Sequence, residues 1–182
     1  MTTPRIHVLA LSGSLRAASA NTRLLKIAAE LAPAGMSVEL YEGLGDLPHF
    51  NPDLDGDDPP AAVRRFRERL QAADGVLVCT PEYANGVPGM LKNAMDWVVS
   101  SGEFYEKPTC TISASPLAIG ARTAHDSLLL TLGMMTAKRV DGGSLTIPLV
   151  NKKLSAEGGL TDDATEAELR RLLEALAAAC GS

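Results

Sequence analysis

The chain has 182 residues, of which 46% are hydrophobic, and its 17 basic and 22 acidic residues give a net charge of −5 at pH 7. This apolar content can form the core of one domain over residues 1–182, and the mixed charge argues against a nucleic-acid-binding surface, which needs a basic stripe. The sequence shows no secretory signal and no apolar run long enough to span a bilayer, so we expect a cytoplasmic protein.

Short apolar runs alternate with segments of helical periodicity along the chain. The apolar runs predict strands at residues 6–11, 36–41, 75–80 and 109–114, and a weaker strand at 137–140 or 145–147. The periodic segments predict helices around residues 24–31, 63–73, 91–98 and 121–135, and a last helix that begins at Thr161 or Thr165.

This order of elements predicts an α/β fold with a doubly wound, five-stranded parallel sheet. Continuous apolar strands are buried on both faces, so the helices between them must cover both faces of the sheet. In such sheets a ligand binds beyond the carboxyl ends of the strands, where the strand order reverses. The loops after the first, third and fourth strands are therefore the candidate site.

The loop after the first strand, residues 12–22, is rich in hydroxyl groups and opens directly onto a helix. A helix start presents free N–H groups and the positive end of its dipole, which favour an anion such as a phosphate monoester. The spacings of a dinucleotide fingerprint and of an NTPase loop are both absent. The alternative is a helix capped by Ser19 or Asn21 that holds no ligand. Side-chain donors in the loop come from Ser14, Arg16, Ser19 and Thr22.

The loop after the third strand begins with PEYANGVPG at residues 81–89 and continues into a helix. Its prolines and glycines stiffen the turn and let the backbone approach a flat ligand closely. The chain has one Trp, three Tyr and three Phe, and four of these aromatics fall between residues 83 and 105. This clustering predicts a stacking site or a subunit interface; the alternative is ordinary, partly buried aromatics. The four are Tyr83, Trp97, Phe104 and Tyr105.

The remaining candidate groups are weaker. Cys79 and Cys110 lie in apolar runs, which indicates buried reduced thiols. No His has a Cys or His partner at metal-ligand spacing, so neither a metal site nor a catalytic His is predicted. Residues 43–60 are crowded with Gly, Pro, Asp and Asn, and form either a lid or interface loop or a mobile loop.

Together, the two loops resemble those of the NADPH-dependent FMN reductase family, which includes quinone, azo and chromate reductases. The family's ring-binding loop, PEYNxxxPGxLKNAxDW, is matched over residues 81–97, except that Ala84 stands where the family has Asn. The family's Gly-Gly-Ala-Arg after the fourth strand is shortened here to residues 120–122, and residues 160–176 resemble its closing helix. The family's phosphate loop, GSxRxxSxN, is matched by Gly13, Ser14, Arg16, Ser19 and Asn21.

The resemblance implies a flavodoxin-like fold that binds FMN. Its ring would contact mostly main-chain atoms, and the side-chain contact of the family's Asn is lost at Ala84. For Glu82, a solvated loop carboxylate is the alternative. The implied cofactor-binding residues are Ser14, Leu15, Arg16, Ala17, Ala18, Ser19, Asn21 and Thr22 around the phosphate, and Pro81, Glu82, Tyr83, Ala84, Asn85 and Ser115 around the isoalloxazine.

The resemblance also implies a function. Hydride would pass from NADPH or NADH to flavin N5, and then to a second small-molecule acceptor (a quinone, free flavin, azo compound or metal oxyanion) by a ping-pong mechanism. No catalytic side chain is implied, because the flavin carries the chemistry. A homodimer or homotetramer is expected, with residues 97–105 as a candidate contact. The alternatives are a flavodoxin-type electron carrier without NAD(P)H activity and a non-enzymatic flavin-binding module.

Overall fold

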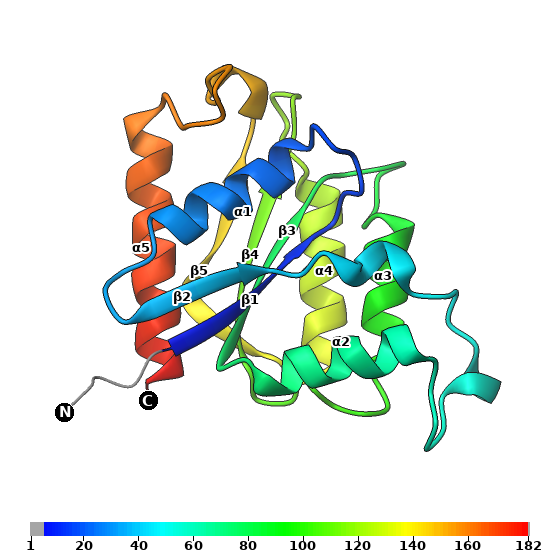
Figure 1. Cartoon of the computed structure of the whole chain (residues 1–182). Coiled ribbons are helices and arrows are strands. Elements are labelled where there is room, and N and C mark those ends of the chain that lie inside the picture. The colour runs from blue at the N-terminus through cyan, green and yellow to red at the C-terminus, as the bar shows by residue number, and fades with distance from the viewer. Residues whose placement is uncertain (1–5, 182) are drawn as a thin grey trace.

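Five parallel strands form one sheet in the order β2-β1-β3-β4-β5. In the computed structural model, which describes residues 6–181, the order reverses between β1 and β3, as in flavodoxin-like proteins (Figure 1). The predicted doubly wound parallel sheet is therefore confirmed. The strands are β1 (Ile6–Ser12), β2 (Met36–Leu40), β3 (Gly75–Thr80), β4 (Pro108–Ala114) and β5 (Lys138–Ile147).

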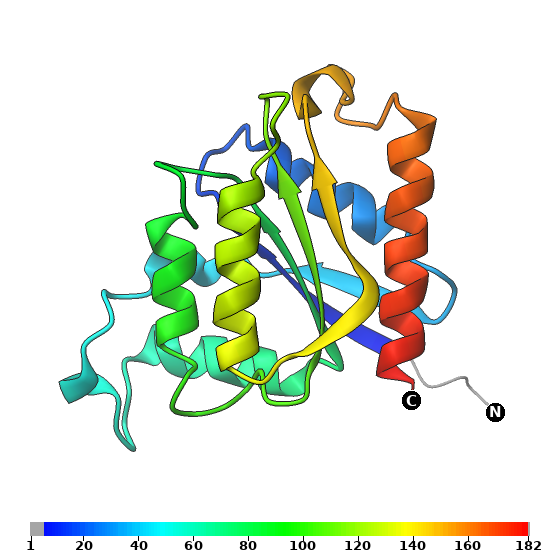
Figure 2. The same cartoon turned by 180° about the vertical axis from the view of Figure 1, so that it is seen from behind.

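Helices cover both faces of the sheet. One face is covered by α1 and α5 and the other by α2, α3 and α4, as the two opposite views show (Figures 1 and 2). Within residues 6–181, no helix combines the length and the apolar character needed to cross a membrane. The helices are α1 (Ala20–Glu30), α2 (Ala61–Ala72), α3 (Gly89–Asp96), α4 (Arg122–Met134) and α5 (Asp163–Cys180).

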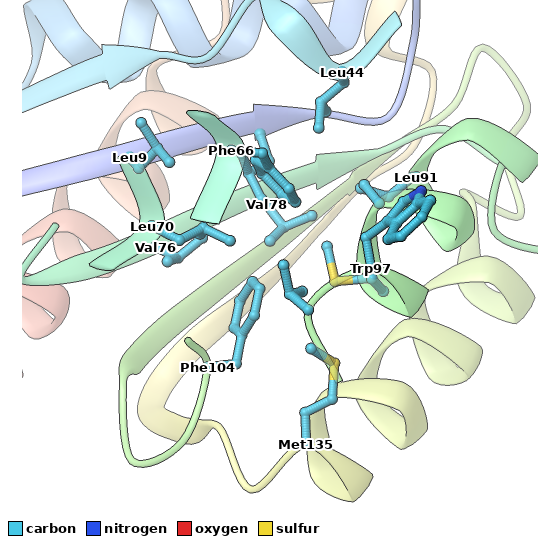
Figure 3. Close-up of a cluster of buried hydrophobic side chains, with 14 of the residues drawn as sticks. Leu9, Leu44, Phe66, Leu70, Val76, Val78, Leu91, Trp97, Phe104 and Met135 are labelled. Carbon is cyan, nitrogen blue, oxygen red and sulfur yellow. The ribbon is translucent and has the colours of Figure 1, made fainter. Parts of the chain in front are cut away.

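Two apolar layers, one on each face, hold the sheet. All six residues of β3 are buried, because this central strand has helices above and below it. On the face of α2, α3 and α4, side chains from the strands meet Phe66, Leu91 and Phe104 (Figure 3). This packing brings the carboxyl ends of β1, β3 and β4 to one edge of the molecule, where their loops meet.

The prediction that residues 97–105 are buried between subunits is wrong for Trp97 and Phe104. Both side chains have no exposed surface within the single chain. The Trp97 ring meets Phe50 edge-on, with ring centroids 5.0 Å apart, and its Nε1–H donates to the carbonyl oxygen of Pro48 at 2.8 Å. Of the three aromatic residues in this segment, Tyr105 alone is exposed, at 67%. Trp97 and Phe104 therefore fill the core, and Trp97 also anchors a loop.

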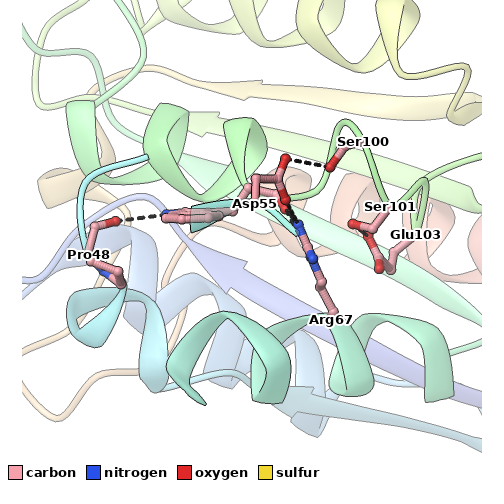
Figure 4. Close-up of polar contacts among 7 residues, drawn as sticks. Pro48, Asp55, Arg67, Ser100, Ser101 and Glu103 are labelled. Atoms are coloured by element: carbon pink, nitrogen blue, oxygen red, sulfur yellow. Dashed lines mark hydrogen bonds and ion pairs between the residues drawn. The ribbon is translucent and has the colours of Figure 1, made fainter. Parts of the chain in front are cut away.

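That loop, residues 43–60, is anchored at two places along its length, which argues against the interpretation as a mobile loop. Asn93 on α3 accepts from the Phe50 N–H at 2.7 Å and donates to the Pro48 carbonyl at 2.9 Å. Further along, Asp55 pairs with Arg67 of α2 at 2.5 Å and accepts from Ser100 at 2.7 Å (Figure 4). The Ser100 hydroxyl and the Arg67 guanidinium hold the pKa of Asp55 below its usual range.

Candidate functional site

A cavity of about 360 Å³ opens where the loops after β1, β3, β4 and β5 meet. Its volume lies within the range of small-molecule and cofactor sites. The structure brings together in its wall most of the residues predicted to bind the cofactor: Ser14, Arg16, Ala18, Ser19, Asn21, Pro81, Glu82, Tyr83 and Ser115.

Gly13 allows close contact between two loops: the phosphate loop, residues 12–22, and the ring loop, residues 81–89. Its N–H donates to the Cys79 carbonyl at 2.8 Å. A Cβ atom at this position would lie 3.0 Å from Pro81 Cδ and 3.2 Å from the Thr80 Cα. A side chain at residue 13 would therefore force the two loops apart.

The phosphate loop ends at the start of α1, where several N–H groups are free. Ser19 is the N-cap, and its Oγ accepts from the Thr22 N–H at 3.3 Å, so of the two predicted caps Ser19 is correct. Within residues 6–181, no hydrogen bond engages the N–H groups of Ala18, Ala20 or Asn21, all of which line the cavity. A helix start with free donors is an anion-binding arrangement.

Charge in the cavity wall has the sign that a phosphate needs. Arg16 is exposed, lines the cavity and has no ion-pair partner in the described part of the chain. Glu82 is the acidic residue in the wall, and its carboxylate is engaged elsewhere. Arg16 is therefore available for a charge-assisted contact with an anion.

The Glu82 side chain reaches the start of α4. Its Oε2 accepts from the N–H of Ala124 at 2.9 Å, and the N-cap of α4, Ala121, provides no side-chain hydrogen bond of its own. The interpretation of Glu82 as a solvated loop carboxylate is therefore wrong. A carboxylate at a helix N-terminus is stabilised by the helix dipole.

Ala84 and Asn85 do not line the cavity but form the turn that presents Tyr83. Tyr83 and Gly86 exchange backbone hydrogen bonds of 3.1 and 3.0 Å. The two residues between them have positive φ angles, 49° at Ala84 and 58° at Asn85. This is a two-residue hairpin turn of the kind that favours Asn or Gly at both central positions. The turn conformation therefore explains why the family pattern has Asn at the position of Ala84.

Tyr83 connects the two loops. Its hydroxyl lies 3.4 Å from the Ser14 hydroxyl, while its side chain is 49% exposed at the mouth of the cavity. An aromatic ring held at one end and exposed on its surface can pack against a flat ligand.

The predicted phosphate residues divide between two cavities. Leu15, Ala17 and Thr22 line a neighbouring cavity of about 220 Å³ near the end of β2, together with Tyr41. Thr22 there pairs with the Ser12 hydroxyl at 2.7 Å. Only Ser14 and Arg16, of the residues predicted to bind FMN, line both cavities. The structure therefore does not place Leu15, Ala17 and Thr22 in the larger cavity.

The sequence interpretation missed one side of the site. Pro116 and Leu117 extend the wall beyond Ser115, and Val150 and Asn151 come from the segment after β5. The Val150 N–H donates to the Ser115 carbonyl at 3.0 Å, which joins the two segments. The parallel topology was the only available signal, since the loop after a fifth parallel strand opens at the same edge.

The residues present fit FMN. Hydroxyls, free N–H groups and one arginine surround the start of α1, as a phosphate monoester requires, and an exposed aromatic ring lies close by. A metal centre has no such support, because residues 6–181 contain no group of three or more His, Cys, Asp or Glu able to hold an ion.

Known proteins resemble the chain over nearly its whole length. An NAD(P)H-dependent FMN reductase of Pseudomonas aeruginosa is 37% identical over 94% of this chain and 93% of its own. A 2-hydroxy-1,4-benzoquinone reductase of a Burkholderia species is 31% identical over 95% of both chains. Among solved structures, the NAD(P)H:acceptor oxidoreductase FerB of Paracoccus denitrificans superposes with a TM-score of 0.87, at 33% identity over 97% of both chains.

The family described as NADPH-dependent FMN reductase matches residues 6–152, which include all strands and both loops of the cavity. The predicted resemblance is thereby confirmed. The chain belongs to the NADPH-dependent FMN reductase family, as an oxidoreductase that uses FMN with NAD(P)H as hydride donor.

Proposed function

We propose that the chain passes hydride from NAD(P)H through FMN bound in the 360 Å³ cavity to a small-molecule acceptor. The observation that carries this proposal is the free set of N–H donors at the start of α1, which opens into the same cavity as Tyr83. A cavity with an anion-binding end and an aromatic end suits a phosphorylated flat ring.

Each end of the cavity has its own role in the proposal. Ser14, Arg16, Ser19 and Asn21, with the N–H of Ala18, would hold the phosphate. The ring loop and Ser115 would hold the isoalloxazine. When bound, FMN supplies the capacity to accept and release hydride, and the side chains bind it, orient it and restrict access.

For the acceptor we propose a quinone. Support comes from the relatives, which include proteins named quinone reductase and 2-hydroxy-1,4-benzoquinone reductase. Free flavin, azo compounds and metal oxyanions are the other candidate acceptors, and both NADPH and NADH are candidate donors. We propose that donor and acceptor share this cavity and enter it in turn, by a ping-pong mechanism.

We also propose that residues 1–182 form one domain and that the protein is a homodimer or homotetramer. Exposed apolar side chains one turn apart on α4, Leu130 and Met134, support self-association, because such surfaces commonly mark a partner contact. A monomeric mass by light scattering would contradict it. The cytoplasmic location stays a prediction.

One experiment separates the proposed reductase from its alternatives. Purified protein loaded with FMN is mixed with NADPH without oxygen, and flavin absorbance is followed. Rapid bleaching is the result expected of the reductase. A yellow protein that does not bleach would be an electron carrier or a non-enzymatic flavin-binding module. A protein that takes up no FMN would be none of the three.

A further inference from the structure

Asn21 is held at one end and free at the other. Its side chain is only 5% exposed, and its Oδ1 lies 3.2 Å from the Sγ of Cys79 on β3. The Nδ2 group has no hydrogen-bond partner within residues 6–181, yet it is not among the enclosed polar atoms without a partner. The residue lines the 360 Å³ cavity, so the accessible side of the amide faces that cavity.

The partner of Asn21 determines which end of the amide faces inward. Cys79 is fully buried in β3, and burial raises the pKa of its thiol, so the sulfur carries its proton at neutral pH. A protonated thiol donates a hydrogen bond and is a poor acceptor, so it selects the amide oxygen. The NH₂ group, which donates, is then left for the cavity.

We propose that Cys79 is a positioning residue for phosphate binding: its thiol holds the oxygen of Asn21 so that the Asn21 NH₂ group is presented to the phosphate of FMN. The inference rests on the proposed function. It assigns a role to a strand residue that does not line the cavity and that no motif includes.

The position of Asn21 at the start of α1 also explains why its NH₂ group would act on the phosphate and not on the flavin ring. Asn21 occupies the first turn of α1, next to the free N–H groups of Ala18 and Ala20. An amide donor there adds to the N–H groups that face an anion. The ring loop contributes nothing to this contact, so loss of the Cys79 donor should affect FMN and leave riboflavin, which lacks the phosphate, unaffected.

The test compares the dissociation constants of FMN and riboflavin for the apoprotein, measured by quenching of flavin fluorescence. The dissociation constant of riboflavin divided by that of FMN reports how much the phosphate contributes to binding. Cys79→Val fills the space without a donor and should lower this ratio about three- to tenfold, the effect of one hydrogen bond. Cys79→Ser keeps a donor and should retain most of the ratio. Asn21→Ala should lower the ratio, and adding Cys79→Val to it should lower it no further.

The matched control is Cys110→Val, a second buried thiol on the neighbouring strand, β4, which should leave the ratio unchanged. An unchanged ratio in Cys79→Val, including the case in which FMN and riboflavin binding weaken equally, would overturn the inference. So would a ratio that falls further in the double variant than in Asn21→Ala alone. If Cys79→Val does not fold, Cys79→Ala is measured in its place. A wild-type protein that binds no FMN would overturn the proposed function itself, whereas a wild-type ratio retained in the donor-free variant overturns only the role of Cys79.

Discussion

Glu82 and Ala124 are joined by a hydrogen bond of 2.9 Å between segments 42 residues apart. The carboxylate belongs to the ring loop, and the N–H belongs to the first turn of α4, whose own N-cap supplies no side chain. One contact therefore caps a helix and fixes the position of the loop that we propose to hold the flavin ring. Stability and cofactor binding should be coupled at Glu82.

We expect Glu82→Ala to lower the free energy of unfolding by about 1 kcal/mol, the usual cost of losing a helix cap, and to weaken FMN binding as well. Glu82→Gln retains an acceptor oxygen and should be affected less. Urea unfolding of the apoprotein and FMN titration measure the two effects.

The matched control is Asp162→Ala, which removes the cap of α5, where Asp162 accepts from the Thr165 N–H at 2.9 Å. It should cost similar stability while leaving FMN affinity unchanged, because Asp162 does not line the cavity. If Glu82→Ala has the same FMN dissociation constant as the wild type, the helix cap at Glu82 does not contribute to FMN binding.

Sequence periodicity predicted the central strands well because they are buried on both faces. The edge strand β5 was ambiguous for the opposite reason. Its residues are mostly exposed, and its pairing with β4 shifts register between Thr109 and Thr111, so the two candidate segments at 137–140 and 145–147 are parts of one irregular strand. Exposed strands lack the continuous apolar run on which the prediction depends.

Contacts between distant segments could not be predicted. Trp97 lies in a cluster of aromatics along the sequence, but its partners, Phe50 and Pro48, come from a loop before α2. Val150 and Asn151, which form part of the cavity wall, belong to no sequence motif. The contact between Asn21 and Cys79 depends on how α1 packs against β3, which the sequence alone does not reveal. The residues of the phosphate-loop motif that line the cavity could be predicted because they lie close together in the sequence, at one helix start.

Ala84 occupies a backbone conformation that favours Asn or Gly. We expect Ala84→Asn to raise the free energy of unfolding by about 0.5–1 kcal/mol, because Asn tolerates a positive φ better than Ala does. Asn85→Ala should shift stability in the opposite direction. Denaturant unfolding of the apoproteins measures both, and a loss of stability in Ala84→Asn would mean that the turn is not strained at this residue.

Arg16 should matter for FMN affinity more than for turnover. We expect Arg16→Ala to raise the FMN dissociation constant by at least tenfold, since a charge-assisted hydrogen bond contributes about 1.5–3 kcal/mol. The rate at saturating FMN should change little. Arg170→Ala is the control, because Arg170 pairs with Glu166 on the surface of α5, away from the cavity. An unchanged FMN constant would remove Arg16 from the phosphate site.

His125 should make stability depend on pH. Its side chain lies between the Thr111 and Thr146 hydroxyls, at 2.8 and 3.3 Å, and is only 6% exposed. Burial lowers the pKa of His125, and the negative charge of Asp126 opposes this shift without cancelling it. The unfolded chain therefore binds a proton more readily than the folded one, so stability falls as the pH drops through the ordinary value of 6.5.

Urea unfolding at pH 7.5 and 5.5 tests this dependence. The wild type should lose more stability over this interval than His125→Gln, which cannot titrate. Equal losses in the two proteins would show that other groups carry the pH dependence.

A single cavity that serves donor and acceptor in turn predicts a specific kinetic pattern. Initial rates for NADPH at several fixed quinone concentrations should give parallel double-reciprocal lines, with each substrate inhibiting at high concentration by occupying the site of the other. Heating should distinguish the ligands too, because a ligand stabilises the fold strongly only when its concentration is well above its dissociation constant. FMN should raise the thermal midpoint clearly, and NADP⁺ at the same concentration should raise it little, since the nicotinamide would contact the cavity only transiently. Lines that intersect, or strong protection by NADP⁺ without FMN, would indicate a separate nucleotide site and contradict sequential use of the 360 Å³ cavity.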